Sequence, residues 1–363
     1  MNSPFPYETY AENESFYGRE VEKEKILSFA NTSTNLVIYS KRRLGKSSLV
    51  REVFRENKEY LFIYCDMFDI TSKEDFASNL LHSLASSIKG DIKVVLKRLS
   101  KLFKRVSLVY SADPQTGKLS LKPDLKALSF QEMMDEFFNT VFELSKKQKI
   151  VIALDEFQQI STLKDAKIDA ILRKYIQENY NISYIFLGSK RHMLNRLFEY
   201  GAPLFEEATS MQLESIKQED INNYVSKHLN ISDEIVEYIY DLTDGETKFI
   251  QHIFHILFVY HKRKEITISL VDEAILEIIH AKSSGYKILF DTFSQFQKKA
   301  FKALSKYSQN IHSKDVLDEY NISKGSMQSA LKQLYQREII DKEDDVWFIP
   351  DRTLELWGKT LLN

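Results

Sequence analysis

One stretch of the chain joins a short apolar run, through five residues, to a glycine, a lysine and two serines. Leu36–Tyr39 has the composition of a buried strand, and the segment Ser40-Lys-Arg-Arg-Leu-Gly-Lys-Ser-Ser48 follows it without a break. A glycine lets the backbone approach a bound anion closely, and the amides at the start of a helix favour negative charge. The stretch therefore predicts a strand, a phosphate-binding loop and a helix, which restricts the first half of the chain to a parallel α/β fold.

The loop carries the groups that bind a nucleoside triphosphate and its metal. The residues expected to line the phosphates are Arg43, Leu44, Gly45, Lys46, Ser47 and Ser48. We expect Lys46 to reach the β- and γ-phosphates and the Ser47 hydroxyl to coordinate Mg²⁺. The side chains of Arg42 and Arg43 have two interpretations, as solvated charges or as phosphate contacts. Ser40 stands where the full pattern G-x-x-x-x-G-K-[ST] has glycine, and serine tolerates a positive φ less well, so the efficiency of hydrolysis is open.

Polar side chains end the next two apolar strands. Ile150–Leu154 leads into Asp155 and Glu156, and Tyr184–Leu187 leads into Gly188 and Ser189. Ligands bind at the carboxyl edge of parallel sheets, so these groups are expected to lie beside the phosphate loop. We predict that Asp155 binds the metal, that Glu156 is the general base for an attacking water, and that Ser189 senses the γ-phosphate or that water. The predicted catalytic residues are thus Glu156, Lys46 and Ser189. The alternative, that the two acids only cap a helix, is less compatible with the upstream loop.

At 363 residues the chain exceeds the usual size of one compact domain. Apolar runs alternate with amphipathic segments up to about residue 210, which predicts an α/β domain at 1–210. A turn-rich segment predicts a hairpin inserted at about 105–123. Helical patterns then replace strands, so 211–289 is predicted to be an all-helical lid. Three helices and two short strands in 290–363 predict a winged helix-turn-helix.

Composition limits the partners. The formal net charge of −2 gives no overall attraction to nucleic acid or to a membrane surface, so such a partner needs a local patch. The chain shows no secretion signal and no apolar run near the roughly 18 residues that span a bilayer, and we therefore expect no membrane partner and a cytoplasmic location. A single cysteine excludes an internal disulfide.

One helix of the predicted winged domain has a basic and polar outer face. Its apolar residues fall at i, i+3, i+4 and i+7 and are expected to face the core; they are Met327, Ala330, Leu331 and Leu334. The predicted contacts to DNA or another partner on its outer face are Lys324, Gln328, Lys332, Gln333 and Arg337. Cations pair with phosphates and glutamines can bind base edges. However, residues 290–363 carry eleven basic and eleven acidic side chains, so a surface that binds a protein partner is the alternative.

Taken together, these motifs resemble the archaeal-type ATPase family of AAA+-like P-loop proteins, near the STAND class and similar to archaeal replication-initiator ATPases. The resemblance rests on the loop and the acid pair above and on three further pieces, Phe16-Tyr-Gly-Arg-Glu20, Gly188-Ser-Lys-Arg-His192 and Gly245-Glu-Thr-Lys-Phe-Ile-Gln251. It implies ATP and Mg²⁺ as cofactors and ATP hydrolysis as the activity. It also implies that Tyr17, Gly18 and Arg19 lie against the adenine and ribose.

One departure from the family bears on turnover. Glu206 and Glu207 follow Pro203-Leu-Phe205, where relatives often carry a basic residue, so no arginine finger is identified. The leading hypothesis is a slowly hydrolysing ATPase that acts as a nucleotide-controlled switch and positions its winged helix on DNA or a protein. The alternatives are a nucleotide-stabilised scaffold without turnover and a partner-activated defence or regulatory ATPase with no DNA role. The sequence leaves the oligomeric state open.

Overall fold

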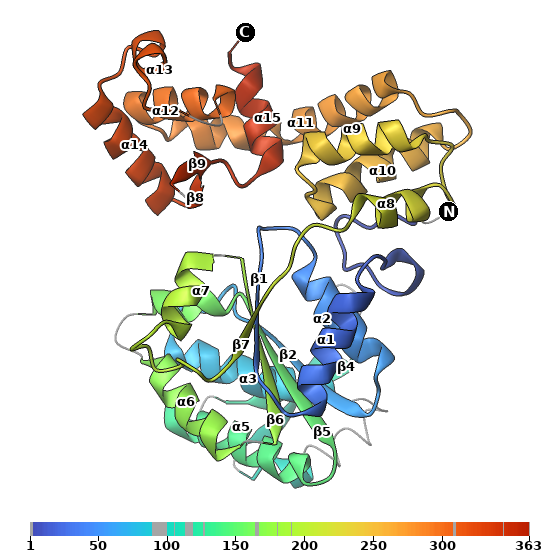
Figure 1. The fold of residues 1–363 in the computed structure, drawn as a ribbon. Coiled ribbons are helices and arrows are strands. Elements are labelled where there is room, and N and C mark those ends of the chain that lie inside the picture. The colour runs from blue at the N-terminus through green and yellow to red at the C-terminus, as the bar shows by residue number, and fades with distance from the viewer. Residues whose placement is uncertain are drawn as a thin grey trace. The chain divides into compact units, whose positions relative to one another are not determined.

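The computed structural model describes residues 3–88, 100–104, 106–112, 119–125, 128–163, 167–179, 181–189, 191–307, 310–343 and 345–362. The chain divides into two compact units (Figure 1). The first unit comprises Met1–Gly18, Arg42–Gly45 and Ser215–Asn363, and the second comprises Arg19–Lys41 and Lys46–Glu214. Each unit is described by itself below. The predicted domain boundaries at residues 210 and 289 stay predictions.

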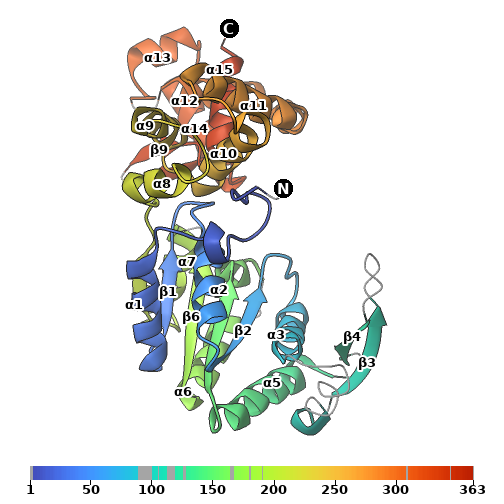
Figure 2. The ribbon, with the colours of Figure 1, turned by 90° about the vertical axis from the view of Figure 1, so that its right-hand side faces the viewer.

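A five-stranded parallel sheet forms the centre of the second unit (Figure 2). Its strands, in spatial order, are β2 (Tyr60–Asp66), β5 (Lys149–Asp155), β6 (Ile182–Gly188), β1 (Leu36–Tyr39) and β7 (Thr209–Gln212). The predicted parallel α/β fold is confirmed. The edge strand β7 was not predicted, because only Met211 of its four residues is buried and no apolar run marks it.

The strand order fixes where the helices of this unit pack. They are α1 (Glu20–Asn31), α2 (Lys46–Glu56), α3 (Lys73–Ser87), α5 (Phe130–Ser145), α6 (Ile168–Glu178) and α7 (Arg191–Phe198). The chain moves from β1 across the sheet to β2 and then returns through β5 and β6, so right-handed connections place α2 on one face and α3, α5 and α6 on the other. In parallel sheets with such a reversal, ligands bind at the carboxyl ends of the central strands.

An antiparallel hairpin is inserted between α3 and α5. It consists of β3 (Ser107–Ala112) and β4 (Leu119–Asp124), with Ser107 opposite Asp124. The predicted insertion at about 105–123 matches these strands, and its turn lies outside the described residues.

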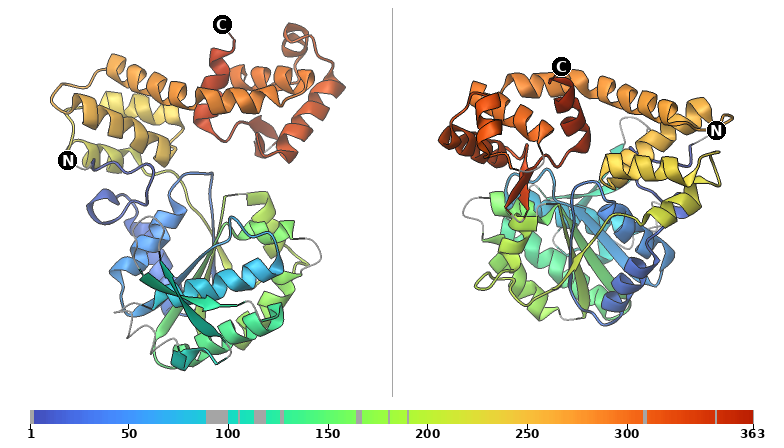
Figure 3. Two further views of the ribbon diagram at one scale, coloured as in Figure 1. Left: turned by 180° about the vertical axis from the view of Figure 1, so that it is seen from behind. Right: turned by 45° about the horizontal axis from the view of Figure 1, so that its top comes forward.

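The first unit is mainly helical (Figure 3). Its elements are α8 (Gln218–Val225), α9 (Asp233–Thr243), α10 (Thr247–His261), α11 (Ile268–Asp291), α12 (Gln295–Lys306), α13 (Lys314–Glu319), α14 (Lys324–Gln336), β8 (Asp341–Glu343), β9 (Val346–Phe348) and α15 (Arg352–Thr360). The strands β8 and β9 pair antiparallel, so the predicted winged helix is confirmed. Helix α15 was not predicted. Within the described part of the chain, no helix combines the length and apolar character needed to cross a membrane.

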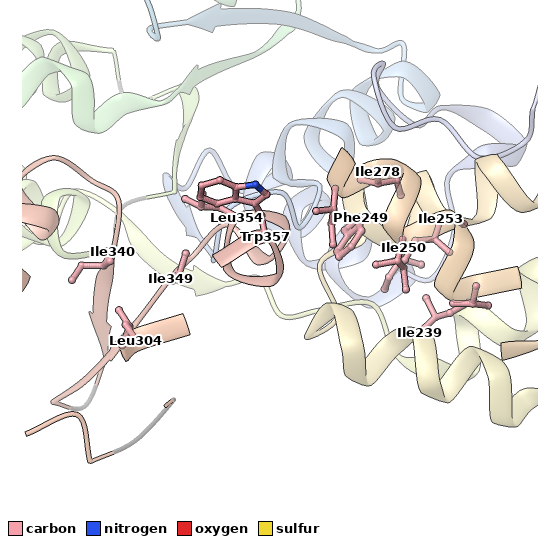
Figure 4. Close-up of a cluster of buried hydrophobic side chains, with 14 of the residues drawn as sticks. Ile239, Phe249, Ile250, Ile253, Ile278, Leu304, Ile340, Ile349, Leu354 and Trp357 are labelled. Atoms are coloured by element: carbon pink, nitrogen blue, oxygen red, sulfur yellow. The ribbon is translucent and has the colours of Figure 1, made fainter. Parts of the chain in front are cut away.

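One apolar cluster holds the first unit together. It joins Ile250 and Ile253 of α10 and Ile278 of α11 to residues of the winged helix that include Leu354 and Trp357 of α15 (Figure 4). Helix α11 runs without interruption from Ile268 to Asp291 and so connects the two groups of helices. The predicted inward positions on α14 are all buried.

The N-terminal segment packs against the helices of this unit. The Phe5 ring is fully buried and makes edge-on contacts with Tyr224 and Phe258, at centroid distances of 5.8 and 6.0 Å. The Tyr224 hydroxyl also donates to the Pro4 carbonyl at 2.8 Å. A polar N-terminal segment therefore contributes one large apolar anchor to the core.

Replacing Phe5 with alanine removes this anchor, and we expect a loss of about 3–5 kcal/mol in the free energy of unfolding of the first unit. Urea unfolding followed by tryptophan fluorescence reports on this unit, since both tryptophans, Trp347 and Trp357, belong to it. Phe296→Ala is the matched control, because that ring is 51% exposed. Equal urea midpoints for the two variants would contradict the assigned role of Phe5.

Candidate nucleotide-binding site

The loop after β1 has two residues in the left-handed region. Arg43 has φ of 65° and Gly45 has φ of 89°, whereas Ser40 is not among the positive-φ residues. Serine at this position therefore imposes no backbone strain. The Ser40 hydroxyl instead accepts a hydrogen bond from the Lys46 ammonium at 2.9 Å, and both residues are buried. The lysine is thus held at the start of α2 by a polar partner that a glycine would not provide.

The predicted metal ligands Ser47 and Asp155 are in direct contact. The Ser47 hydroxyl at the first turn of α2 donates to Asp155 Oδ2 at the end of β5, and the Tyr64 hydroxyl of β2 donates to the same oxygen. Asp155 Oδ1 accepts from the Glu156 amide at 2.9 Å. Two oxygen groups at this position suit Mg²⁺, which retains most of its water. No group of three His, Cys, Asp or Glu side chains that could hold a metal occurs among the described residues, so a zinc-type site is not built there.

Glu156 follows directly and has an unusual backbone conformation, with φ of 50°. Its carboxylate accepts hydrogen bonds from the Gln158 amide and from the Ser189 hydroxyl, the latter at 3.2 Å. Ser189 comes after β6, so the ends of two neighbouring strands bring the predicted base and the predicted sensor together. The second unit therefore assembles Lys46, Ser47, Asp155, Glu156 and Ser189 at one edge of its sheet.

Tyr17 and Gly18 belong to the first unit. The Tyr17 ring stacks on Tyr224 at 4.0 Å, and its hydroxyl accepts from the Gln251 amide at 2.9 Å. Gly18 has φ of 68°, and a Cβ there would lie 2.7 Å from Ile216, so only glycine fits. Arg19 belongs to the second unit, where it is 3% exposed and pairs with Glu22 at 2.8 Å. The role of these three residues at adenine and ribose stays a prediction.

The Arg43 side chain is not a solvated charge. Its guanidinium lies 2.9 Å from Asp351 Oδ2 and 3.5 Å from Glu246 Oε1, and its carbonyl accepts from the Lys248 amide at 3.2 Å. These residues all belong to the first unit. Arg42 makes a more exposed contact with Glu338 at 3.4 Å, a kind of pair that contributes little to stability. The loop tip is therefore bound chiefly through Arg43.

The pKa values of the two carboxyl groups beside Arg43 are shifted in opposite directions. Burial raises the pKa of Glu246 from its ordinary value of 4.5 to about 7, although the charge of Arg43 acts against this shift. Burial also raises the pKa of Asp351, but the hydrogen bond and charge of Arg43 outweigh it, so the pKa of Asp351 lies below its usual range. Glu246 is thus the group in this cluster whose charge changes near neutral pH.

The predicted partner residues on α14 fall into two groups. Lys324, Gln328 and Lys332 are exposed on the outer face of the helix. Gln333 accepts a hydrogen bond from the Gln297 amide at 3.0 Å, and Arg337 donates to Thr292 and lies 5.0 Å from the Phe293 ring centroid. The last two side chains therefore have contacts within the domain.

Glu207, in the region where relatives often carry a basic residue, has structural partners. Its carboxylate accepts from Gln177 at 2.6 Å and from Arg173 at 3.1 Å. These contacts give it a role in holding the segment before β7 and no role in charge stabilisation at a phosphate.

Two polar residues of the site, Tyr64 and Gln158, are not indicated by any sequence motif. Tyr64 reaches Asp155 from the neighbouring strand, which no local motif reveals. Gln158 lies two residues after Glu156 and is fully buried, but it stands in the mixed segment Phe-Gln-Gln-Ile-Ser-Thr, which gives no sequence signal for its burial.

The chain belongs to the family described as "ATPase domain predominantly from Archaea", which it matches over residues 16–253. Residues 284–360 match a probable winged helix domain. The protein is therefore an archaeal-type P-loop ATPase with a winged helix.

Known proteins similar to the chain agree with this assignment. It is 24% identical to an uncharacterised ATP-binding protein of Methanocaldococcus jannaschii, an alignment covering 90% of this chain and 99% of that protein. The structure of a Walker-type ATPase of Pyrococcus abyssi is similar with a TM-score of 0.67 at 17% identity, covering 98% of this chain and all of that one. The ORC1 protein of Aeropyrum pernix, solved in complex with DNA, is similar with a TM-score of 0.53 at 11% identity, covering 96% and 94%.

Glu246 generates a testable pH dependence. A carboxyl whose pKa is raised on folding stabilises the folded state fully below its ordinary pKa, and that contribution is lost as pH rises through about 7. Between about pH 5 and about pH 8, we expect the free energy of unfolding of the first unit to fall by about 1–3 kcal/mol more in wild type than in Glu246→Gln. Urea midpoints from tryptophan fluorescence measure this difference. The exposed Glu277→Gln serves as control, and parallel pH profiles for wild type and Glu246→Gln would refute the assignment.

Proposed function

We propose that the protein binds Mg·ATP and hydrolyses it slowly. The contact of Lys46 and Ser47 at the start of α2 with groups ending β1 and β5 carries this proposal. Lys46 would exchange its bond to Ser40 for the β- and γ-phosphates, and Ser47 and Asp155 would hold the metal. Mg²⁺ when bound would neutralise charge on the phosphates. Glu156 would take the proton of the attacking water, with Ser189 beside it.

We further propose a division into an ATPase domain at 1–210, a lid at 211–289 and a winged helix at 290–363. The ion pairs of Arg43 with Glu246 and Asp351 support a switch, because they connect the phosphate-loop tip to a residue of the lid and one of the winged helix. Nucleotide phosphates would compete with these carboxylates for Arg43. Occupancy of the loop would then change how the winged helix is held.

Exposed Lys324, Gln328 and Lys332 on α14 support DNA as the partner of the winged helix. The fold shared with a protein solved in complex with DNA agrees with this. Against it, the β8–β9 wing is acidic, with Glu343 and Asp345 beside its turn. A protein partner is the alternative that these acids favour.

The first experiment measures Mg·ATP binding by calorimetry and phosphate release for Lys46→Ala and Glu156→Gln. Loss of the lysine removes a charge from the phosphates, so we expect at least tenfold weaker binding and lost turnover. Glu156→Gln should retain binding while turnover falls by about 10²-fold or more, the usual contribution of a general base. Lys58→Ala and Glu59→Gln, both exposed in the same unit, are matched controls. Unchanged phosphate release in Glu156→Gln, with binding intact, would favour the scaffold without turnover.

The second experiment tests DNA binding by fluorescence anisotropy with a duplex at two salt concentrations. If α14 contacts phosphates, Lys332→Gln should reduce the magnitude of the slope of log affinity against log salt concentration by about one. The reason is that one fewer counterion is released on binding. Lys287→Gln on the exposed side of α11 is the control. If the affinity for DNA does not change with salt, or is the same in Lys332→Gln as in wild type, α14 is excluded as the DNA-binding surface. A protein partner is then favoured.

A further inference from the structure

Gln158 is a polar side chain in a fully buried position. It lies in the 3-10 helix Phe157–Thr162, two residues after Glu156, and none of its surface is exposed. Its neighbours Phe157 and Ile160 belong to the core of the second unit. Burying an amide costs free energy unless both of its ends find hydrogen-bond partners. The contacts of Gln158 therefore indicate whether it serves packing alone.

Among the described residues, only one end of the Gln158 amide has a hydrogen-bond partner. Its Nε2 donates to Glu156 Oε2, and a carboxylate oxygen can only accept, so this contact fixes the orientation of the amide. The opposite atom, Oε1, is buried without a hydrogen-bond partner among the described residues. A methionine of similar length would fill the same space without an unmatched oxygen. Packing alone does not account for a glutamine here.

Gly188 at the end of β6 makes room for this amide. A Cβ at Gly188 would lie 2.5 Å from Gln158 Oε1 and 3.0 Å from Leu194 Cδ2. Gly188 does not have a positive φ. Glycine is therefore needed here because it lacks a side chain, and not because of its backbone freedom. Gly188 and Gln158 thus fit as a pair.

The two oxygens of the Glu156 carboxylate differ in their contacts. Oε2 accepts from Gln158 and lies 3.2 Å from the Ser189 hydroxyl, whereas among the described residues Oε1 has only the longer contact of 3.5 Å with Ser189. We infer that Gln158 is a positioning residue that holds Glu156 by Oε2 and leaves Oε1 to accept the proton of the attacking water. The inference rests on the proposed hydrolysis, in which Glu156 is the base.

The test compares kcat and KM for ATP in wild type, Gln158→Met, Gln159→Met and Glu156→Gln. A misplaced base slows the chemical step without weakening nucleotide binding, so kcat of Gln158→Met should fall about tenfold to a hundredfold while KM stays within about twofold. Gln159→Met changes the neighbouring glutamine, which is only partly buried, and should match wild type.

Gly188→Ala is a second variant in case Gln158→Met does not fold. Its Cβ would displace the Gln158 amide, so it should reproduce the fall in kcat at unchanged KM. Wild-type kcat in Gln158→Met, or in Gly188→Ala if Gln158→Met does not fold, would overturn the inference while Glu156→Gln still blocked turnover. If Glu156→Gln behaved as wild type, the proposed hydrolysis through Glu156 would fail, and the inference with it.

Discussion

Parallel pairing in register is the constraint on which the candidate site depends. Tyr39 of β1 lies opposite Gly188 of β6, and Leu154 of β5 lies opposite Phe186. The residues after these strands therefore leave the sheet at nearly the same height. Because side chains alternate between faces, a shift of one residue in either pairing would turn the groups that follow the strand away from one another. The apolar strand residues, which determine the register, thus also determine which polar groups meet at the candidate site.

The sequence was sufficient where a feature depends on neighbours along the chain. The apolar strand before Gly45 and the acids after Leu154 are local, and so are the inward positions of α14. It was insufficient where partners come from other strands. Tyr64 meets Asp155 because β2 pairs with β5, and β7 exists because Thr209–Gln212 pairs with β1. The role of Gln333 and Arg337 within the winged helix likewise follows from contacts with Gln297 and Thr292.

Ser40 illustrates how a departure from a pattern is accommodated. The loop needs left-handed backbone at some residues, and it has this at Arg43 and Gly45. A non-glycine residue in that region costs on the order of 1 kcal/mol or more and persists only where its surroundings hold it. Arg43 has such surroundings, since two carboxylates bind its guanidinium and the Lys248 amide binds its carbonyl. Ser40 itself does not have a positive φ, so this loop does not need glycine at its first position.

Glu156 presents the same combination of strain and restraint at the other side of the site. Its φ of 50° is unfavourable for a residue with a side chain, yet its carboxylate has two donors and its amide donates to Asp155. Helix caps at Asp244 and turn positions at Asn321 also have positive φ, but those residues have the short polar side chains that tolerate this conformation. Glutamate lacks such a short side chain, although Glu206 and Glu338 also have positive φ. The buried Gln158 donates to the Glu156 carboxylate, so a positive φ at Glu156 and an unmatched buried oxygen at Gln158 lie side by side, where the proposed catalytic role of Glu156 accounts for both.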